Sequence, residues 1–206
     1  MKVVFRVDAS PVVGIGHLMR CLALATRFSK EGWSVYFASR SDTIAYFPVT
    51  LRNEYEVVVL TGQRKTEVEC LRRNIPDGAT ILVVDHYNWD AEIENSCRNW
   101  ADTIVVIDDL ANRHHDTDIL LDQTFGRDAH EYRLLVPNKC QIIVGSKYAL
   151  LRPEFTENRS EALSRRNSRR GIVDRILVSL GNNDSSHIVS LILDAVQESD
   201  LDVAID

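Results

Sequence analysis

The sequence predicts an α/β protein in which helices cover a parallel β-sheet. Short apolar runs rich in valine and isoleucine alternate with stretches whose apolar residues recur at the helical period. Few polar residues interrupt the apolar runs, which is typical of strands that are buried on both faces. The chain has 206 residues, of which 45% are hydrophobic and 26% charged, so it can bury a sizeable core.

The expected elements follow one another in a regular order. A first strand, residues 3–7, leads into a loop with one proline and two glycines, and a helix with apolar periodicity is expected at 17–31. Gly32 is a helix-stop signal, and a second strand is expected at 34–38 directly after it. The same two patterns predict further strands at 57–60, 81–85, 104–107, 118–121 and 141–144, and helices at 65–73 and 90–100.

The character of the sequence changes after residue 152, where apolar residues thin out and residues 164–171 become polar and basic. This change predicts a linker at 156–173 that follows an N-terminal domain, 1–155. A phosphate-binding segment is the alternative interpretation of the basic stretch.

A second βαβ unit is expected to begin after the linker, at residues 174–206. Roughly thirty residues cannot close a second parallel sheet on a core of their own, so this segment is expected to be the beginning of a truncated C-terminal domain. Its strands are expected at 175–180 and 201–205, with a turn at 181–185 and a helix at 186–197.

Charge and cysteine usage exclude several classes of protein. The formal net charge of −6 argues against general binding to nucleic acids or anionic membranes. The four cysteines contain no CxxC pair, which fits reduced thiols better than a disulfide framework or a zinc site. The N-terminus becomes charged too early for a signal peptide, and no apolar run approaches the roughly 20 residues of a membrane helix. The protein is therefore expected to be cytoplasmic.

The loop between the first strand and the first helix carries the most informative motif. It contains Gly14, Gly16 and His17, and Arg20 follows one helical turn later. Parallel α/β sheets place ligands at this end of their strands. The glycines permit close approach of the backbone, and the free amides that begin the helix can face an anion or a polarised oxygen.

His17 is a candidate general base. The partial positive charge of a helix N-terminus disfavours the imidazolium form by about 0.3–1 kcal/mol, and a neutral imidazole can accept a proton from water. Two other interpretations stay open: a tight structural turn capped by His17, or a dinucleotide-binding loop. The dinucleotide fingerprint lacks its third glycine, because Met19 stands there, and Arg40 rather than an acidic residue follows the second strand.

Other polar residues also lie where predicted strands end. Asp85 ends one strand and Asp108-Asp109 another, so these carboxylates either contact a substrate or cap the next loop. Of Arg6 and Asp8, at the end of the first strand, one could orient His17 or the loop; a structural ion pair is the alternative.

Three other histidines are candidates for contacts with a ligand or a metal. His86 could contact a ligand or lie in a solvated loop. The sequence His114-His115-Asp116 is reminiscent of a metal site, but adjacent histidines in a polar loop seldom chelate one ion together. No metal and no cofactor are expected.

Taken together, the motifs resemble one family, the UDP-2,4-diacetamido-2,4,6-trideoxy-β-L-altropyranose hydrolases of pseudaminic acid biosynthesis, and the related spore-coat polysaccharide biosynthesis proteins. The resemblance runs in order from residue 1 to about residue 185 and corresponds to the N-terminal portion of the family. It rests on Arg6-x-Asp8-x-Ser10, Gly14-x-Gly16-His17-x-x-Arg20, Asp85-His86-Tyr87, the segments 107–113 and 118–123, and Gly145-x-x-Tyr148 with the residues up to Phe155.

The resemblance implies a GT-B-like fold, in which two Rossmann-like domains face each other across a cleft. It also implies a metal-free hydrolysis: water displaces UDP from the anomeric carbon of the sugar with inversion. His17 would orient or deprotonate that water, and Tyr87 would lie close to the sugar. The expected substrate-binding residues are Gly14, Gly16, Arg20, Tyr87, Asp8, Asp85 and Asp109.

This chemistry needs fewer acids than most glycoside hydrolysis. Most glycosidases use a carboxylic acid to protonate the leaving oxygen and a second carboxylate opposite it. A nucleoside diphosphate leaves without a proton, so one base and stabilisation of the diphosphate charge can suffice. The alternatives are a GT-B glycosyltransferase and a non-catalytic sugar-binding or interaction module.

The resemblance weakens toward the C-terminus. The family has a Gly-Gly-x-Asp-Pro-type turn where this chain has Gly181-Asn182-Asn183-Asp184-Ser185. The second domain normally supplies much of the uridine diphosphate site, including helix N-termini for the pyrophosphate. The chain alone is therefore expected to hydrolyse a UDP-sugar poorly or not at all, and the missing C-terminal domain is its expected partner.

Overall fold

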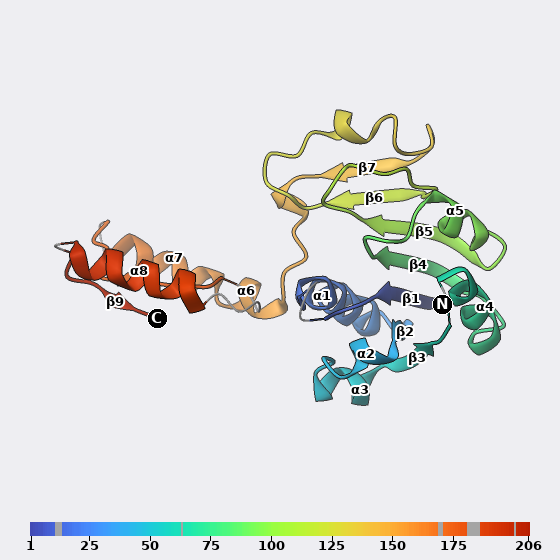
Figure 1. Cartoon of the computed structure of the whole chain (residues 1–206), viewed down its shortest axis with the longest axis horizontal. Helices are drawn as coiled ribbons and strands as arrows, with labels where there is room; N and C mark the ends of the chain where they lie inside the picture. The colour runs from blue at the N-terminus through green and yellow to red at the C-terminus, as the bar shows by residue number, and fades with distance from the viewer. Residues whose placement is uncertain (11–13, 63, 169–170, 181–185, 200) are drawn as a thin grey trace.

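The computed structural model describes residues 1–206 except 11–13, 63, 169–170, 181–185 and 200 (Figure 1). Within the described residues, seven strands form one parallel sheet in the order β3-β2-β1-β4-β5-β6-β7. The order reverses between β1 and β4, where open α/β sheets bind their ligands. The strands are β1 (Lys2–Val7), β2 (Ser34–Arg40), β3 (Glu56–Leu60), β4 (Ala79–Asp85), β5 (Ala101–Ile107), β6 (Ile119–Asp122) and β7 (Gln141–Val144).

Both faces of the sheet are covered, as the apolar runs predict. Along β1, Val4 packs into one apolar cluster and Phe5 into another on the opposite face. The first cluster includes Leu71 of α4, and the second includes Leu18 of α1. The helices that accompany the sheet are α1 (Gly16–Lys30), α2 (Ser41–Ile44), α3 (Val49–Glu54), α4 (Arg64–Asn74) and α5 (Ala91–Ser96), with 3-10 turns η1 (Ala129–Tyr132) and η2 (Ser146–Tyr148).

Helix α1 ends where Gly32 predicts. Gly32 adopts a φ of +80°, and the amide of Trp33 donates to the carbonyl of Phe28 at 3.1 Å. The rings of Phe28 and Trp33 meet edge to face with 4.9 Å between centroids, which completes a C-terminal cap with its hydrophobic contact. The helix begins at Gly16, one residue before the predicted start.

One predicted helix is too long. The expected helix at 90–100 ends at Ser96. Asp90 caps its start by accepting from the amides of Glu92 and Ile93, but the chain turns after Cys97. The cause is Trp100, whose indole donates to the carbonyl of Ile75 at 2.8 Å and lies in the core. The short helices α2 and α3 have no counterpart in the sequence analysis.

The C-terminal elements extend away from the sheet (Figure 1). Much of the expected linker is helical, since α6 (Pro153–Glu157) and α7 (Arg159–Ser168) lie in or next to it. Helix α8 (Ser186–Glu198) matches its prediction, whereas β8 (Arg175–Ile176) and β9 (Ala204–Ile205) are shorter than expected. The expected turn at 181–185 lies outside the described residues. Among the described helices, none combines the length and apolarity needed to pass through a bilayer.

Candidate active site

Helix α1 presents an uncapped N-terminus at the end of β1. Gly14 adopts a φ of +80°, and its amide donates to the carbonyl of Ser10 at 2.6 Å, which closes the loop that leads into the helix. Ile15 occupies the N-cap position and its side chain makes no capping hydrogen bond. The first helical bond joins the amide of Met19 to the carbonyl of Ile15, so the amides of the first helical turn precede it without intrahelical acceptors.

The ring of His17 is paired with the carboxylate of Asp85. Nδ1 of His17 lies 2.5 Å from Oδ1 of Asp85, the last residue of β4, which pairs with Val7 of β1 across the sheet. Asp85 is 1% exposed and His17 7% exposed. A carboxylate at Nδ1 favours the tautomer with its proton on Nδ1 and leaves the lone pair of Nε2 free to accept a proton.

Arg20 keeps Asp85 in place and charged. Its Nε donates to Oδ2 of Asp85 and its Nη2 to Oδ1, both at 2.6 Å, and its Nη1 donates to Asp109 at 3.0 Å. Burial would raise the pKa of Asp85, but the hydrogen bonds from Arg20 and His17 and the charge of Arg20 outweigh it and lower the pKa below the usual value. Nη2 also lies 3.0 Å from Nδ1 of His17. With the proton on Nδ1 this is a close contact rather than a hydrogen bond.

Tyr87 forms the outer wall of the site. Its ring meets the ring of His17 edge to face with 4.6 Å between centroids, and the residue is 37% exposed. Burial and the charge of Asp109 raise the pKa of Tyr87, so its hydroxyl keeps its proton at neutral pH. Next to these rings lies a pocket of about 40 Å³, which has room for about one water molecule. It is lined by Asp8, His17, Asp85, His86, Tyr87 and Asn88.

Asp8 lines this pocket but contacts different groups. Its Oδ2 accepts from Arg6 at 2.9 Å and lies 3.1 Å from Nε2 of His86. Burial opposes ionisation of Asp8, yet the hydrogen bonds from His86 and Arg6 hold its pKa well below the usual range. Of the two interpretations of Arg6 and Asp8, the ion pair is therefore present, and the residue that contacts His17 is Asp85.

The neighbouring aspartates 108 and 109 have different environments. Asp109 reaches the site through Arg20, whereas Asp108 is 1% exposed and accepts from the amides of Leu110 and Ala111 and from the hydroxyl of Tyr132. Asp108 thus caps a loop and stays away from the pocket.

The motif His114-His115-Asp116 is divided between two environments. His115 is buried with Nδ1 at 2.8 Å from Glu94, and Asp116 pairs with Arg98. Within the part of the chain that the structure describes, no group of three or more histidine, cysteine or acidic residues could coordinate a metal ion.

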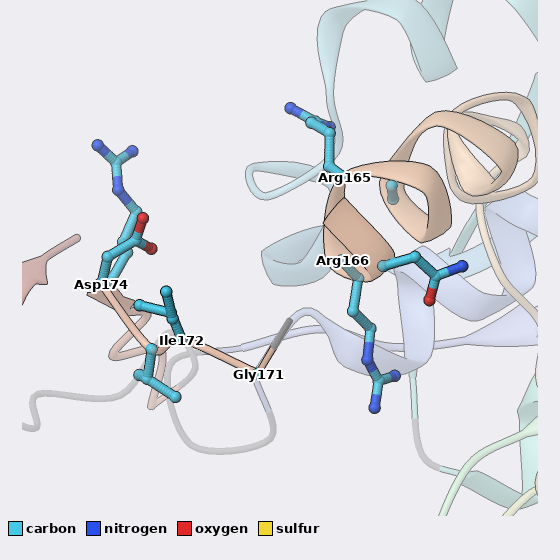
Figure 2. Close-up of a pocket in the computed structure, with 9 residues that line it drawn as sticks. Arg165, Arg166, Gly171, Ile172 and Asp174 are labelled. Carbon is cyan, nitrogen blue, oxygen red and sulfur yellow. The ribbon is translucent and has the colours of Figure 1, made fainter. Parts of the chain in front are cut away.

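A larger hollow, of about 830 Å³, lies elsewhere, between α7 and the segment 171–175. Figure 2 shows Arg165 and Arg166 on the helix and Gly171, Ile172 and Asp174 on the segment facing it. None of the residues that line it belongs to the motifs at the strand ends. Chemistry rather than size therefore identifies the pocket at His17 as the candidate site.

The arrangement of the sheet defines the class of protein. No protein-family model matches the chain. In fold it is similar to MurG of Acinetobacter baumannii, with a TM-score of 0.60 and 10% identity over 99% of this chain and 59% of that one. The expected fold class is confirmed: this is an α/β protein of the GT-B-like, Rossmann-like type.

The chain is also similar in sequence to proteins of two organisms. A UDP-2,4-diacetamido-2,4,6-trideoxy-β-L-altropyranose hydrolase of Campylobacter jejuni is 33% identical over 166 residues, which are 78% of this chain and 56% of that protein. An uncharacterised protein of Methanocaldococcus jannaschii is 23% identical over 98% of this chain and 41% of its own length. The resemblance drawn from the motifs is thereby confirmed, and the chain is a relative of the Campylobacter jejuni hydrolase. It spans about half the length of the two relatives.

Proposed function

We propose that this chain carries the catalytic base of a UDP-sugar hydrolase that releases a 2,4-diacetamido-2,4,6-trideoxy sugar and UDP. The observation that carries the proposal is the pair of Asp85 and His17, which borders a pocket of one-water size at the strand ends. The name of the Campylobacter jejuni relative supports the reaction class.

In this mechanism Nε2 of His17 removes a proton from water as the water oxygen bonds to the anomeric carbon. The bond from that carbon to the diphosphate oxygen breaks, and UDP leaves with the electron pair. Attack from the side opposite to UDP inverts the configuration of the carbon. The carboxylate of Asp85 stabilises the imidazolium that forms, as in other carboxylate–histidine pairs.

The remaining groups of the site orient the base and bind the substrate in this mechanism. Arg20 holds the carboxylate of Asp85 in its charged form. Tyr87 packs on the imidazole and offers a protonated hydroxyl beside the sugar. In this proposal the uncapped amides of α1 and the two glycines at its start, Gly14 and Gly16, accommodate the sugar and the developing phosphate charge. We expect the uridine diphosphate site to be supplied largely by a second domain.

The direct test is release of UDP from the UDP-linked 2,4-diacetamido-2,4,6-trideoxy sugar. The 206-residue chain should be assayed alone and within any longer protein that contains it. His17→Ala should reduce turnover by about 10²–10⁴-fold, the usual contribution of a general base, while binding is retained. His130→Ala is the matched control, because this imidazole is 67% exposed.

Four outcomes would contradict parts of the proposal. Loss of folding in His17→Ala would assign the histidine a structural role. Sugar transfer that depends on an added acceptor would identify a glycosyltransferase, and sugar binding without turnover in the longer protein would identify a binding module. Full turnover by the 206-residue chain alone would show that no second domain is needed.

A further inference from the structure

A second, larger pocket adjoins the pocket at His17. It has a volume of about 250 Å³ and shares three lining residues with the smaller one, Asp8, His86 and Asn88. Arg6, Arg40 and Glu67 also line it, and we call it the Arg6 pocket. Because the two pockets share a wall, a ligand whose reacting carbon lies near His17 can extend a substituent into the Arg6 pocket.

Arg6 lies in this pocket with one nitrogen unused. The residue is 0% exposed; its Nε donates to Glu67 at 3.0 Å and its Nη2 to Asp8 at 2.9 Å. The guanidinium also lies over the ring of Trp89, 5.6 Å from its centroid, so its orientation is determined on three sides. Nη1 is buried and has no hydrogen-bond partner among the residues that the structure describes. A buried guanidinium nitrogen requires an acceptor, and a ligand in this pocket can supply one.

The charges around Arg6 disfavour an anion as that acceptor. Asp8 and Glu67 pair with Arg6, and Glu67 also lies 3.5 Å from Arg40. Asp42 adds a further carboxylate at the rim. The two arginines are therefore opposed by at least as many acidic groups, which leaves no excess positive charge for an anion to neutralise.

His86 contributes no positive charge either. Its Nδ1 accepts from the amide of Asn88 at 3.0 Å, and its Nε2 lies 3.1 Å from Asp8, an arrangement that suits the neutral ring with its proton on Nε2. A neutral carbonyl oxygen is the kind of acceptor that fits this pocket.

We propose that the Arg6 pocket binds an acetamido group of the sugar, with the amide oxygen accepting a hydrogen bond from Nη1 of Arg6. This inference rests on the proposed function, because it assigns a substituent to a sugar whose anomeric carbon lies near His17. An acetamido group offers a strong neutral acceptor and is small enough for the space. The pocket thereby selects sugars that are acetylated on nitrogen over their hydroxyl counterparts.

A binding experiment tests this assignment without turnover. The 206-residue chain, labelled with ¹⁵N, is titrated with free 2,4-diacetamido-2,4,6-trideoxyaltrose and with 6-deoxyaltrose, which carries hydroxyl groups at the same carbons. Saturable shifts are expected for the Nε–H resonance of Arg6 and the amides of Ala9 and Arg40. The acetamido sugar should bind about tenfold more tightly, or about 1.4 kcal/mol, within the range of a hydrogen bond to a charged group. Equal affinity, or no shift of the Arg6 resonance, would overturn the proposal.

Arg6→Lys provides the matched variant. It keeps a cation between Asp8 and Glu67 but removes Nη1, so the tenfold preference should disappear while the native spectrum remains. Retention of the preference would refute the role of Arg6. If this variant does not fold, the Arg6 resonance of the unmodified chain decides the question.

A further variant separates this inference from the proposed function. His17→Ala should retain the preference for the acetamido sugar, since the imidazole does not line the Arg6 pocket. Acetamido binding without hydrolysis in the longer protein would leave the pocket assigned and refute the hydrolase. Hydrolysis of the UDP-linked sugar by a protein that binds the two free sugars equally well would support the hydrolase and refute the assignment of the pocket.

Discussion

Replacement of Asp85 by Asn probes the proposed base more sharply than removal of the imidazole. The substitution preserves the shape of the side chain but removes the charge that faces Nδ1 of His17 at 2.5 Å. An amide nitrogen at this position would donate to Nδ1, so the proton of the ring would move to Nε2 and the base would lose its lone pair. In a comparable carboxylate–histidine pair this tautomer error lowers the turnover number about 10⁴-fold. We expect a loss of about 10²–10⁴-fold here.

The same substitution also affects stability, and the two effects have to be separated. Arg20 donates twice to Asp85 at 2.6 Å but keeps its bond to Asp109. Breaking a buried ion pair costs about 3–5 kcal/mol, and the retained partner and the amide oxygen of Asn should keep the loss at or below about 3 kcal/mol. Unfolding in urea measures this cost, and UDP release should be assayed where the variant is fully folded.

The double variant gives the decisive comparison. If Asp85 acts only through the imidazole, then His17→Ala combined with Asp85→Asn should be no slower than His17→Ala alone. Additive losses would show that Asp85 contributes independently. Activity of Asp85→Asn within a few fold of the unmodified protein would refute the assignment of the pair as the catalytic element.

Three further outcomes are expected. Tyr87→Phe keeps the ring that packs on the imidazole and should cost less than tenfold in turnover, whereas Tyr87→Ala should cost more. An equally large loss of UDP release in both variants would assign the role to the hydroxyl. Burial lowers the pKa of His86 despite Asp8, so below about pH 6.5 the unfolded chain binds a proton that the folded one resists. Stability should therefore fall as the pH drops through that value, and urea unfolding at pH 7.5 and 5.5 should show a smaller difference in His86→Gln. Burial raises the pKa of Cys97 to about 12 and that of Cys21 well above its usual value, so neither thiol should react with iodoacetamide at pH 8 until the protein is unfolded, as mass spectrometry can detect.

The sheet could be predicted because the signal for each strand lies in the residues of the strand itself. Each is a short apolar run, and the structure places a strand over every run predicted in the first 155 residues. The helices α2 and α3 escaped prediction because four to six residues are too few to display a 3.6-residue period. The early end of α5 also depends on a tertiary contact, the bond from the indole of Trp100 to Ile75.

The residues of the candidate site were predicted from the sequence, but the hydrogen bonds among them were not. His17 and Asp85 are 68 positions apart, and only the placement of β4 beside β1 brings them together. The adjacency of these strands at the reversal of strand order was a usable signal, because residues that end neighbouring strands meet at one edge. No feature of the sequence indicated that Asp85 rather than Asp8 is the partner of His17, since both carboxylates lie where strands end at that edge.

The three-residue spacing of His17 and Arg20 has a consequence for how this helix can change. Both side chains reach one carboxylate, which is possible because positions three apart lie on the same side of a helix. Each inserted residue turns everything beyond it by roughly 100° about the axis, so adding or deleting one amino acid between these positions would carry the guanidinium away from Asp85. Any related sequence with an insertion or deletion in this turn would therefore need other contacts to hold its imidazole in one orientation.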